Sequence, residues 1–86
     1  MTCEVVVLYF AKSCELAGVR SENVTVPQET TTRQLWEEIT SLHPRLCSIQ
    51  DHVVLAIRQE YVAIGDEAIS LRPGDEVAII PPISGG

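Results

Sequence analysis

Two stretches of the chain are apolar at almost every position, one near each end. Residues 3–10 read Cys-Glu-Val-Val-Val-Leu-Tyr-Phe, and residues 77–80 read Val-Ala-Ile-Ile. Because successive side chains of a strand point to opposite faces, each stretch predicts a strand that is covered on both faces. Continuous apolar strands favour parallel pairing, so we expect these two side by side in the middle of one sheet. Phe10 would then lie beside Ile80, where the chain leaves the sheet.

A helical repeat follows in the second quarter of the chain. Thr31 and Gln34 have the spacing of a capping box, which predicts that a helix begins there. His43-Pro44 ends it, because the residue before a proline is disfavoured in the helical region. Trp36 is expected alongside the apolar stripe, and the acidic Glu37 and Glu38 on the solvent face. The predicted apolar stripe consists of Leu35, Ile39 and Leu42.

The remaining elements are short. A helix is predicted over residues 11–17, ended by Gly18, and a further helical turn from Pro44 through Leu46 and Ile49. Arg72-Pro73-Gly74-Asp75 has the residues of a type II turn. The order of elements predicts an α+β roll, in which one mixed sheet grasps one main helix. The other predicted strands are residues 21–26, closed by Pro27, and 53–57, 61–64 and 68–71, with turns at 58–60 and 65–66.

The last six residues are expected to form an extended tail on a domain of residues 1–80. Pro81 cannot donate to a sheet ladder and therefore stops the strand, and Pro82 keeps Pro81 extended. At ~3.3 Å per residue the tail could reach roughly 20 Å. Gly85 and Gly86 add no side chains, so the terminal carboxylate suits entry into a narrow active site of another protein. The alternative is a frayed end without function.

Composition and charge narrow the function classes. The 86 residues are 45% hydrophobic, which indicates one small folded domain. Their net charge of −6 would be repelled by the phosphate backbone of a nucleic acid. We therefore expect no nucleic-acid partner, and an acidic surface better suits a basic protein. No apolar run reaches the ~20 residues that span a bilayer, so no membrane contact is expected. The three widely spaced cysteines, Cys3, Cys14 and Cys47, predict no disulfide framework and fit the cytosol.

The side chains contain no recognisable catalytic constellation. His43 and His52 lack metal-ligand spacing, so surface or capping roles are expected rather than a metal site. No glycine-rich phosphate loop or nucleophile–base pair is visible, and a catalytic or persulfide-carrying cysteine is disfavoured. The reactive group that remains is the carboxylate of Gly86. A carboxylate is a poor electrophile, so its use requires activation, for example as an acyl-adenylate made with ATP.

Four motifs together resemble a known family. They are Val-Leu-Tyr-Phe-Ala at residues 7–11, Glu-Leu-Ala-Gly at 15–18, Arg-Pro-Gly-Asp-Glu-Val-Ala at 72–78 and Pro-Pro-Ile-Ser-Gly-Gly at 81–86. Over essentially its whole length the chain resembles the small subunit of molybdopterin synthase, a ubiquitin-like β-grasp sulfur carrier. It departs from the pattern at Arg58, where bacterial relatives often carry asparagine, and this concerns the hairpin rather than the chemistry.

The resemblance implies a carrier that is consumed and recharged, not an enzyme on its own. An E1-like adenylyltransferase and sulfurtransferase would use ATP to form a glycyl adenylate at Gly86, in which the chain is transiently a nucleotide-linked phosphoprotein. The same enzyme would then convert the adenylate to a thiocarboxylate. No cofactor would be bound stably. The tail (Pro81, Pro82, Ile83, Ser84, Gly85) would enter the large synthase subunit, in a heterotetramer of two small and two large subunits. There it would donate sulfur to cyclic pyranopterin monophosphate, forming the molybdopterin dithiolene.

Two other classes remain open from the sequence. A ubiquitin-like modifier conjugated to lysines, or a sulfur carrier for tRNA thiolation, would share the fold and the tail. A β-grasp interaction module with an inert end is the third option. For partner binding we expect Phe10 and Ile80 beside the exit of the tail, with Tyr61 on the neighbouring hairpin, although Phe10 could instead be an ordinary core residue.

Overall fold

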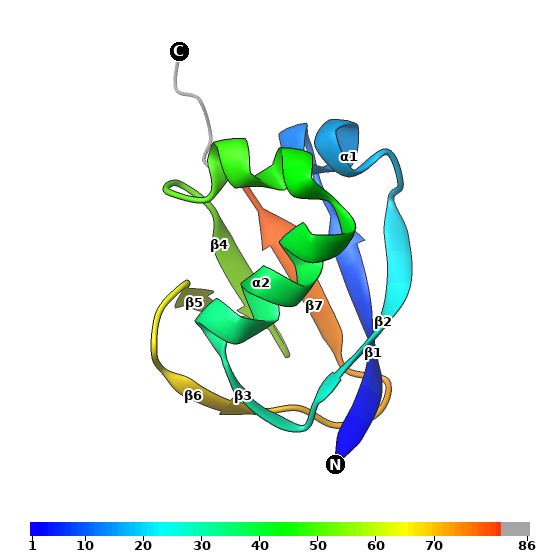
Figure 1. The fold of residues 1–86 in the computed structure, drawn as a ribbon, viewed down its shortest axis with the longest axis vertical. Coiled ribbons are helices and arrows are strands. Elements are labelled where there is room, and N and C mark those ends of the chain that lie inside the picture. The colour runs from blue at the N-terminus through cyan, green and yellow to red at the C-terminus, as the bar shows by residue number, and fades with distance from the viewer. Residues whose placement is uncertain (82–86) are drawn as a thin grey trace.

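The computed structural model describes residues 1–81, which form one sheet of five strands, a second sheet of two strands, and three helices (Figure 1). The strand order of the larger sheet is β2-β1-β7-β4-β5. Its strands are β1 (Thr2–Tyr9), β2 (Ser21–Pro27), β4 (Val54–Ile57), β5 (Glu60–Ala63) and β7 (Glu76–Ile80), and the smaller sheet pairs β3 (Glu29–Thr31) with β6 (Ala68–Ser70). The helices are α1 (Lys12–Ala17), α2 (Thr32–Leu42) and the 3-10 helix η1 (Pro44–Ile49).

The parallel pairing of the terminal strands is confirmed. Tyr9 is opposite Ile79 and Val7 opposite Val77, while every other pair in the larger sheet is antiparallel. The carboxyl ends of β1 and β7 therefore lie at the same end of the molecule as α1 (Figure 1). The predicted mixed sheet is also confirmed, but β6 does not belong to it and pairs with β3 in a second sheet. Sequence reasoning missed β3, because three residues rich in threonine have no visible period.

One face of the larger sheet packs against α2 and forms the core. Val5, Val7, Leu55, Val77 and Ile79 are all fully buried on that face. Leu35, Trp36 and Ile39 of α2 cover them, as the helical repeat predicted. At roughly 25 cal/mol per Å² of apolar surface, this buried face is the main source of stability.

Two expectations about burial were wrong. Leu42 was predicted on the buried stripe, but it is 53% exposed, because the helix ends there and the chain turns away at His43-Pro44. The terminal strands were predicted to be covered on both faces. In β1 and β7 burial alternates instead, and Val6 and Ile80 on the second face are only partly buried, because within residues 1–81 no helix covers that face.

The local signals for caps and turns were read correctly. The Thr31 side chain accepts a hydrogen bond from the Gln34 N–H at 3.1 Å, and Gly18 ends α1 with a φ of +80°. The second half of the capping box is absent, since Gln34 Oε1 accepts from Thr30 instead. Gly74 has a φ of +86° in the predicted type II turn, which Asp75 N–H closes on Arg72 C=O at 3.0 Å.

The hairpin that contains Arg58 carries backbone strain. Arg58 and Gln59 have φ values of +50° and +68°, the left-handed region that favours glycine or asparagine in a two-residue hairpin. Arg58 offsets part of this cost with its guanidinium, which donates to Asp75 Oδ2 at 2.9 Å and to Ser70 C=O at 3.0 Å. An arginine at this position therefore ties the β4–β5 hairpin to the loop before β7.

Candidate functional site

The uncovered face of the larger sheet is the first candidate for a partner-binding surface. Paired residues of a sheet point to the same side, so the register places Leu8, Ala78, Ala56 and Tyr61 in one row across four strands. Tyr61 is 73% exposed and the others of this row are partly buried. We call this surface the open face; its members are Val6, Leu8, Val54, Ala56, Tyr61, Ala63, Ala78 and Ile80.

Phe10 lies where the open face meets the exit of β7. It follows β1 directly, its ring is 50% exposed, and the register of Tyr9 with Ile79 places it level with Ile80. The alternative that Phe10 is an ordinary core residue is therefore wrong. A shallow hollow of about 430 Å³ adjoins it, lined by Leu8, Tyr9, Phe10, Ala11, Cys14, Arg20 and Ser21.

The described chain ends at Pro81, immediately after β7. Pro81 is buried, so the body of the domain holds the base of the predicted tail. Gly86 and the tail residues Pro82, Ile83, Ser84 and Gly85 lie outside the described residues, and their predicted roles stay predictions. Phe10, Ile80 and Pro81 thus lie at the same end of the molecule, at the root of the predicted reactive tail.

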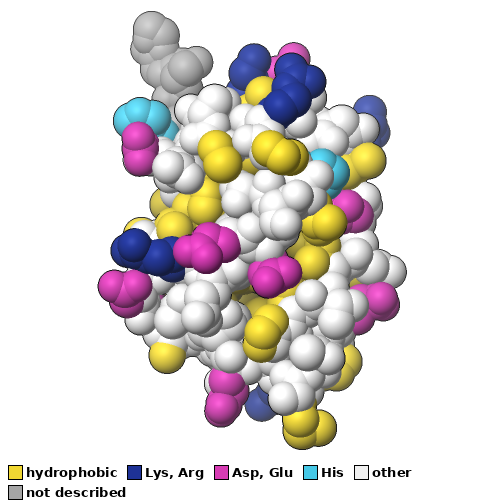
Figure 2. All heavy atoms as spheres, in the orientation of Figure 1, with side chains coloured by type: hydrophobic (Ala, Val, Ile, Leu, Met, Phe, Trp, Pro, Cys, Tyr) yellow, Lys and Arg dark blue, Asp and Glu magenta, His cyan; other side chains and the backbone are white. Residues whose placement is uncertain are grey.

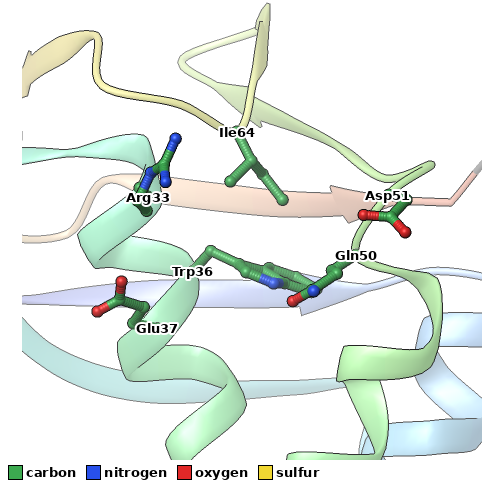
Figure 3. A pocket seen from close by; sticks show the side chains of 6 residues that line it. All are labelled: Arg33, Trp36, Glu37, Gln50, Asp51 and Ile64. Atoms are coloured by element: carbon green, nitrogen blue, oxygen red, sulfur yellow. The ribbon is translucent and has the colours of Figure 1, made fainter.

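The other side of the molecule has a different surface. In Figure 2 the apolar side chains occur in small groups among polar ones, acidic side chains are scattered over the face, and several Lys and Arg lie at the end that carries α1. A hollow of about 440 Å³ lies between α2, the residues after η1 and the β5–β6 loop, with the Trp36 indole lying across it below Ile64 (Figure 3). Its charged residues, Arg33, Glu37 and Asp51, include no nucleophile–base pair, so this hollow supports no chemistry that we can assign.

A cluster that sequence reasoning missed joins β1, β2 and the end of α2. The Tyr9 hydroxyl donates to Glu22 Oε2 at 2.5 Å, and His43 Nε2 contacts the same oxygen. Burial, followed by the Glu22 carboxylate, raises the pKa of Tyr9 well above its ordinary value, so this phenol stays protonated. His43 was expected at the surface or in a cap; its backbone does cap α2, but its ring packs edge-on against Tyr9 at 5.6 Å.

The remaining candidates for chemistry stay without support. Cys3 is buried, Cys14 partly buried and Cys47 exposed, and all three are free thiols. Within residues 1–81 no cluster of histidine, cysteine and acidic side chains could hold a metal ion. No helix of the described chain is long and apolar enough to cross a bilayer.

Comparisons with known proteins assign the family. The model of the ThiS family matches residues 7–86. The chain is 57% identical to the molybdopterin synthase sulfur carrier subunit of Homo sapiens, over 98% of this chain and 96% of that protein. It is 46% identical to the protein of the same description from Chlamydomonas reinhardtii, over 96% of this chain and 99% of that protein.

A solved structure shows the same fold. SAMP1 from Haloferax volcanii, a small archaeal modifier protein, superposes with a TM-score of 0.79 at 30% identity, over 96% of this chain and 99% of that one. These matches confirm the predicted ubiquitin-like β-grasp roll and the resemblance to the small subunit of molybdopterin synthase. The chain belongs to the ThiS family.

Proposed function

We propose that this chain is the sulfur carrier subunit of a molybdopterin synthase, and that it works through a thiocarboxylate at Gly86. The observation that carries the proposal is the open face, an apolar sheet surface that leads to Phe10 and Ile80 at the root of the Pro81–Gly86 tail. Contiguous exposed apolar surface marks a protein-binding site. The match to the ThiS family extends through residue 86, so it includes the terminal glycine pair.

The proposed cycle begins with activation of the carboxylate. An E1-like adenylyltransferase joins the Gly86 carboxylate to AMP from ATP and releases pyrophosphate. Sulfide-level sulfur (HS⁻) supplied by the same activating system then attacks the acyl carbon, the C–O bond to AMP breaks, and loss of the S–H proton leaves a thiocarboxylate. In this cycle the chain supplies a slim substrate, and the activating enzyme and the large subunit supply the catalytic side chains.

The second half of the proposed cycle takes place in the large catalytic subunit. The open face docks on that subunit, and the tail extends from Pro81 into its active site, where sulfur passes to cyclic pyranopterin monophosphate. Two small and two large subunits form the proposed heterotetramer, in the cytosol. A buried base at Pro81 supports this arrangement, because a tail fixed at its root loses less conformational freedom on entering a channel.

A protein modifier is the second candidate function. It is favoured by the similarity to SAMP1, which carries the description of a small archaeal modifier protein. Both candidates require adenylation of the terminal glycine, but they differ in the nucleophile that follows. A sulfur donor gives a thiocarboxylate, whereas a lysine amine gives an isopeptide bond to another protein.

Intact mass separates the two candidates. The chain is expressed with its activating enzyme, purified and weighed by mass spectrometry. Exchange of one oxygen for sulfur at the terminus, an increase of about 16 Da, supports the carrier; lysine-linked adducts support the modifier. An unchanged mass would contradict both. The matched control lacks Gly86 and should stay unmodified.

The cysteines provide a second control on where sulfur is carried. We expect a variant with Cys3, Cys14 and Cys47 all replaced by alanine to acquire the same thiocarboxylate, with a lower melting temperature because Cys3 is 6% exposed. The measurement is the mass of the terminal peptide. Complete loss of sulfur from a folded triple variant would contradict the terminal-carboxylate mechanism.

A further inference from the structure

The Ser13 side chain is completely buried at the end of the molecule from which the tail departs. Its hydroxyl oxygen accepts a hydrogen bond from the Phe10 N–H at 2.9 Å and lies 2.7 Å from Phe10 C=O and 3.3 Å from Ile79 C=O. Both carbonyl oxygens are within reach of the single hydroxyl proton. Ser13 thus joins Phe10, the residue after β1, to Ile79 near the end of β7, which lies 66 positions further along the sequence.

The turn that Ser13 closes is strained. Ala11 has φ +53° and ψ −127°, close to the angles of the first central residue in a type II′ turn. This conformation is unfavourable for residues other than glycine. Ser13 N–H closes the turn on Phe10 C=O at 3.1 Å. Such a conformation persists only where surrounding contacts enforce it, and the buried Ser13 hydroxyl supplies three of them. The result is that Phe10 leaves the strand with its ring half exposed.

The chain contains a second hydroxyl of the same kind at a different place. Thr32 is also completely buried, accepts from Gly65 N–H at 2.8 Å and lies 3.0 Å from Ala63 C=O and from Gly65 C=O. It joins the start of α2 to the end of β5 and to the β5–β6 loop, and it makes no hydrogen bond to Phe10 or to β7. Thr32 therefore has the burial and the number of hydrogen-bonding contacts of Ser13, but not its contacts with Phe10 and Ile79.

We propose that Ser13 is a positioning residue, whose hydroxyl fixes both the docking aromatic Phe10 and the end of β7 from which the tail continues. The proposal rests on the proposed function, because it gives Phe10 a role in binding the large subunit. Ser13 does not touch that partner. It acts by holding Phe10 and Ile79 in one rigid unit, so the ring and the root of the tail meet the partner in a fixed relation.

The test compares Ser13→Ala with Thr32→Val in binding and in stability. Each change removes one buried hydroxyl, so we expect both to lower the melting temperature to a similar extent. We expect Ser13→Ala to raise the Kd for the large subunit about tenfold, because Ser13 contacts Phe10 and residues in contact are energetically coupled. We expect Thr32→Val to raise this Kd by less than about twofold, because residues without a shared contact act almost independently. Binding is measured by calorimetry at a temperature where circular dichroism shows both variants folded. An equal rise in Kd for the two variants would overturn the proposal.

A double-mutant cycle with Phe10→Ala adds a readout that a purely structural role would not move. If Ser13 acts by placing Phe10, Ser13→Ala should weaken binding by less than about twofold once Phe10 is already alanine. An undiminished tenfold loss in that background would contradict the assignment. Ser13→Cys preserves most of the side-chain volume but is a weak hydrogen-bonding partner, so it repeats the test should Ser13→Ala fail to fold.

Amide hydrogen exchange in the unmodified chain tests the geometry without a variant or a partner. The Phe10 N–H should exchange about as slowly as the Tyr9 N–H, which is bonded to Arg20 C=O at 2.8 Å. Exchange of the Phe10 amide at the rate of an unprotected amide would overturn the role of Ser13. Failure of the wild-type chain to bind the large subunit would instead contradict the proposed function, and the exchange result would still decide the geometry.

Discussion

The central strands of the five-stranded sheet carry apolar residues on both faces, and the two faces differ in what covers them. On one face Val77 and Ile79 are fully buried beneath α2. On the other, Ala78 and Ile80 of the same strand are only partly buried, and Tyr61 is 73% exposed. Under the proposed function, the first face forms the core of this domain and the second docks on the large subunit.

This difference separates the residues that fold the domain from those that engage a partner. Changes on the buried face should lower stability and affect binding only through the folded fraction. Changes on the open face and at Phe10 should weaken binding while the domain stays folded. The predictions below are arranged by the size of the effect that this separation implies.

The largest loss of stability is expected on the buried face. Ile79→Ala removes three methyl or methylene groups from a fully buried site, which should cost about 2–5 kcal/mol of unfolding free energy. Urea denaturation measures it, with Ile80→Ala as the matched control one residue along the same strand. The control should lose much less stability, since Ile80 is only partly buried. Equal losses would remove the distinction between the faces.

The reverse behaviour is expected at Phe10. Phe10→Ala should weaken binding to the large subunit by about 2 kcal/mol or more, as exposed aromatics at the centre of an interface do, with a small change in melting temperature. Leu42→Ala is the control, because Leu42 is an apolar residue of similar exposure, 53% against 50%, on α2 at the other side of the sheet. We expect Tyr61→Ala to weaken binding less than Phe10→Ala. Loss of stability and binding in the same proportion would contradict the docking role of Phe10.

The smallest effect concerns the hairpin that borders the open face. Gln59 has a φ of +68°, so Gln59→Gly should raise the unfolding free energy by up to about 1 kcal/mol, because relief of about 1–2 kcal/mol of left-handed strain exceeds the entropy cost of glycine, about 0.5–1 kcal/mol. Thermal unfolding measures the gain. Binding to the large subunit should be unchanged, because β5, which carries Tyr61, keeps its register with β4. A loss of stability would show that the Gln59 side chain, and not its backbone, stabilises the turn.

Much of the fold could be predicted because its signals are local or periodic. The apolar runs of the terminal strands predicted their central position and parallel pairing, and His43-Pro44 and Gly74 marked a helix end and a turn. The resemblance in four motifs predicted the family. These features depend on residues close together in sequence or on the alternation of a strand.

The features that escaped prediction depend on contacts between distant residues. The pairing of β3 with β6 joins two three-residue segments that have no pattern of their own. Burial of both faces was predicted from apolar runs, but a run does not reveal whether its cover belongs to the same chain. The buried hydroxyl of Ser13 and the contact of Tyr9 with Glu22 arise only when β1, β2 and β7 come together.

Changing the length of the predicted tail is the most direct test of the sulfur-carrier function. Because sulfur transfer requires a reacting distance of about 3–3.5 Å, the length of the chain beyond Pro81 should be fixed by the pocket of the large subunit. Removing Gly86 shortens the reach by ~3.3 Å, and adding one alanine places a new residue beyond the reactive position. Both variants are prepared with a semisynthetic thiocarboxylate, so that differences in loading cannot contribute, and each should melt at the temperature of the parent chain.

The deciding measurement is single-turnover conversion of cyclic pyranopterin monophosphate by the synthase reconstituted with each thiocarboxylated chain. We predict turnover with the parent chain and a loss of at least about 10²-fold with the shortened and the extended tail, the scale expected for misplaced reacting groups. Gly85→Val should also turn over poorly while remaining folded, because a branched side chain would have to enter a channel that fits bare backbone. Near-normal turnover from the shortened or extended tail would contradict the carrier function.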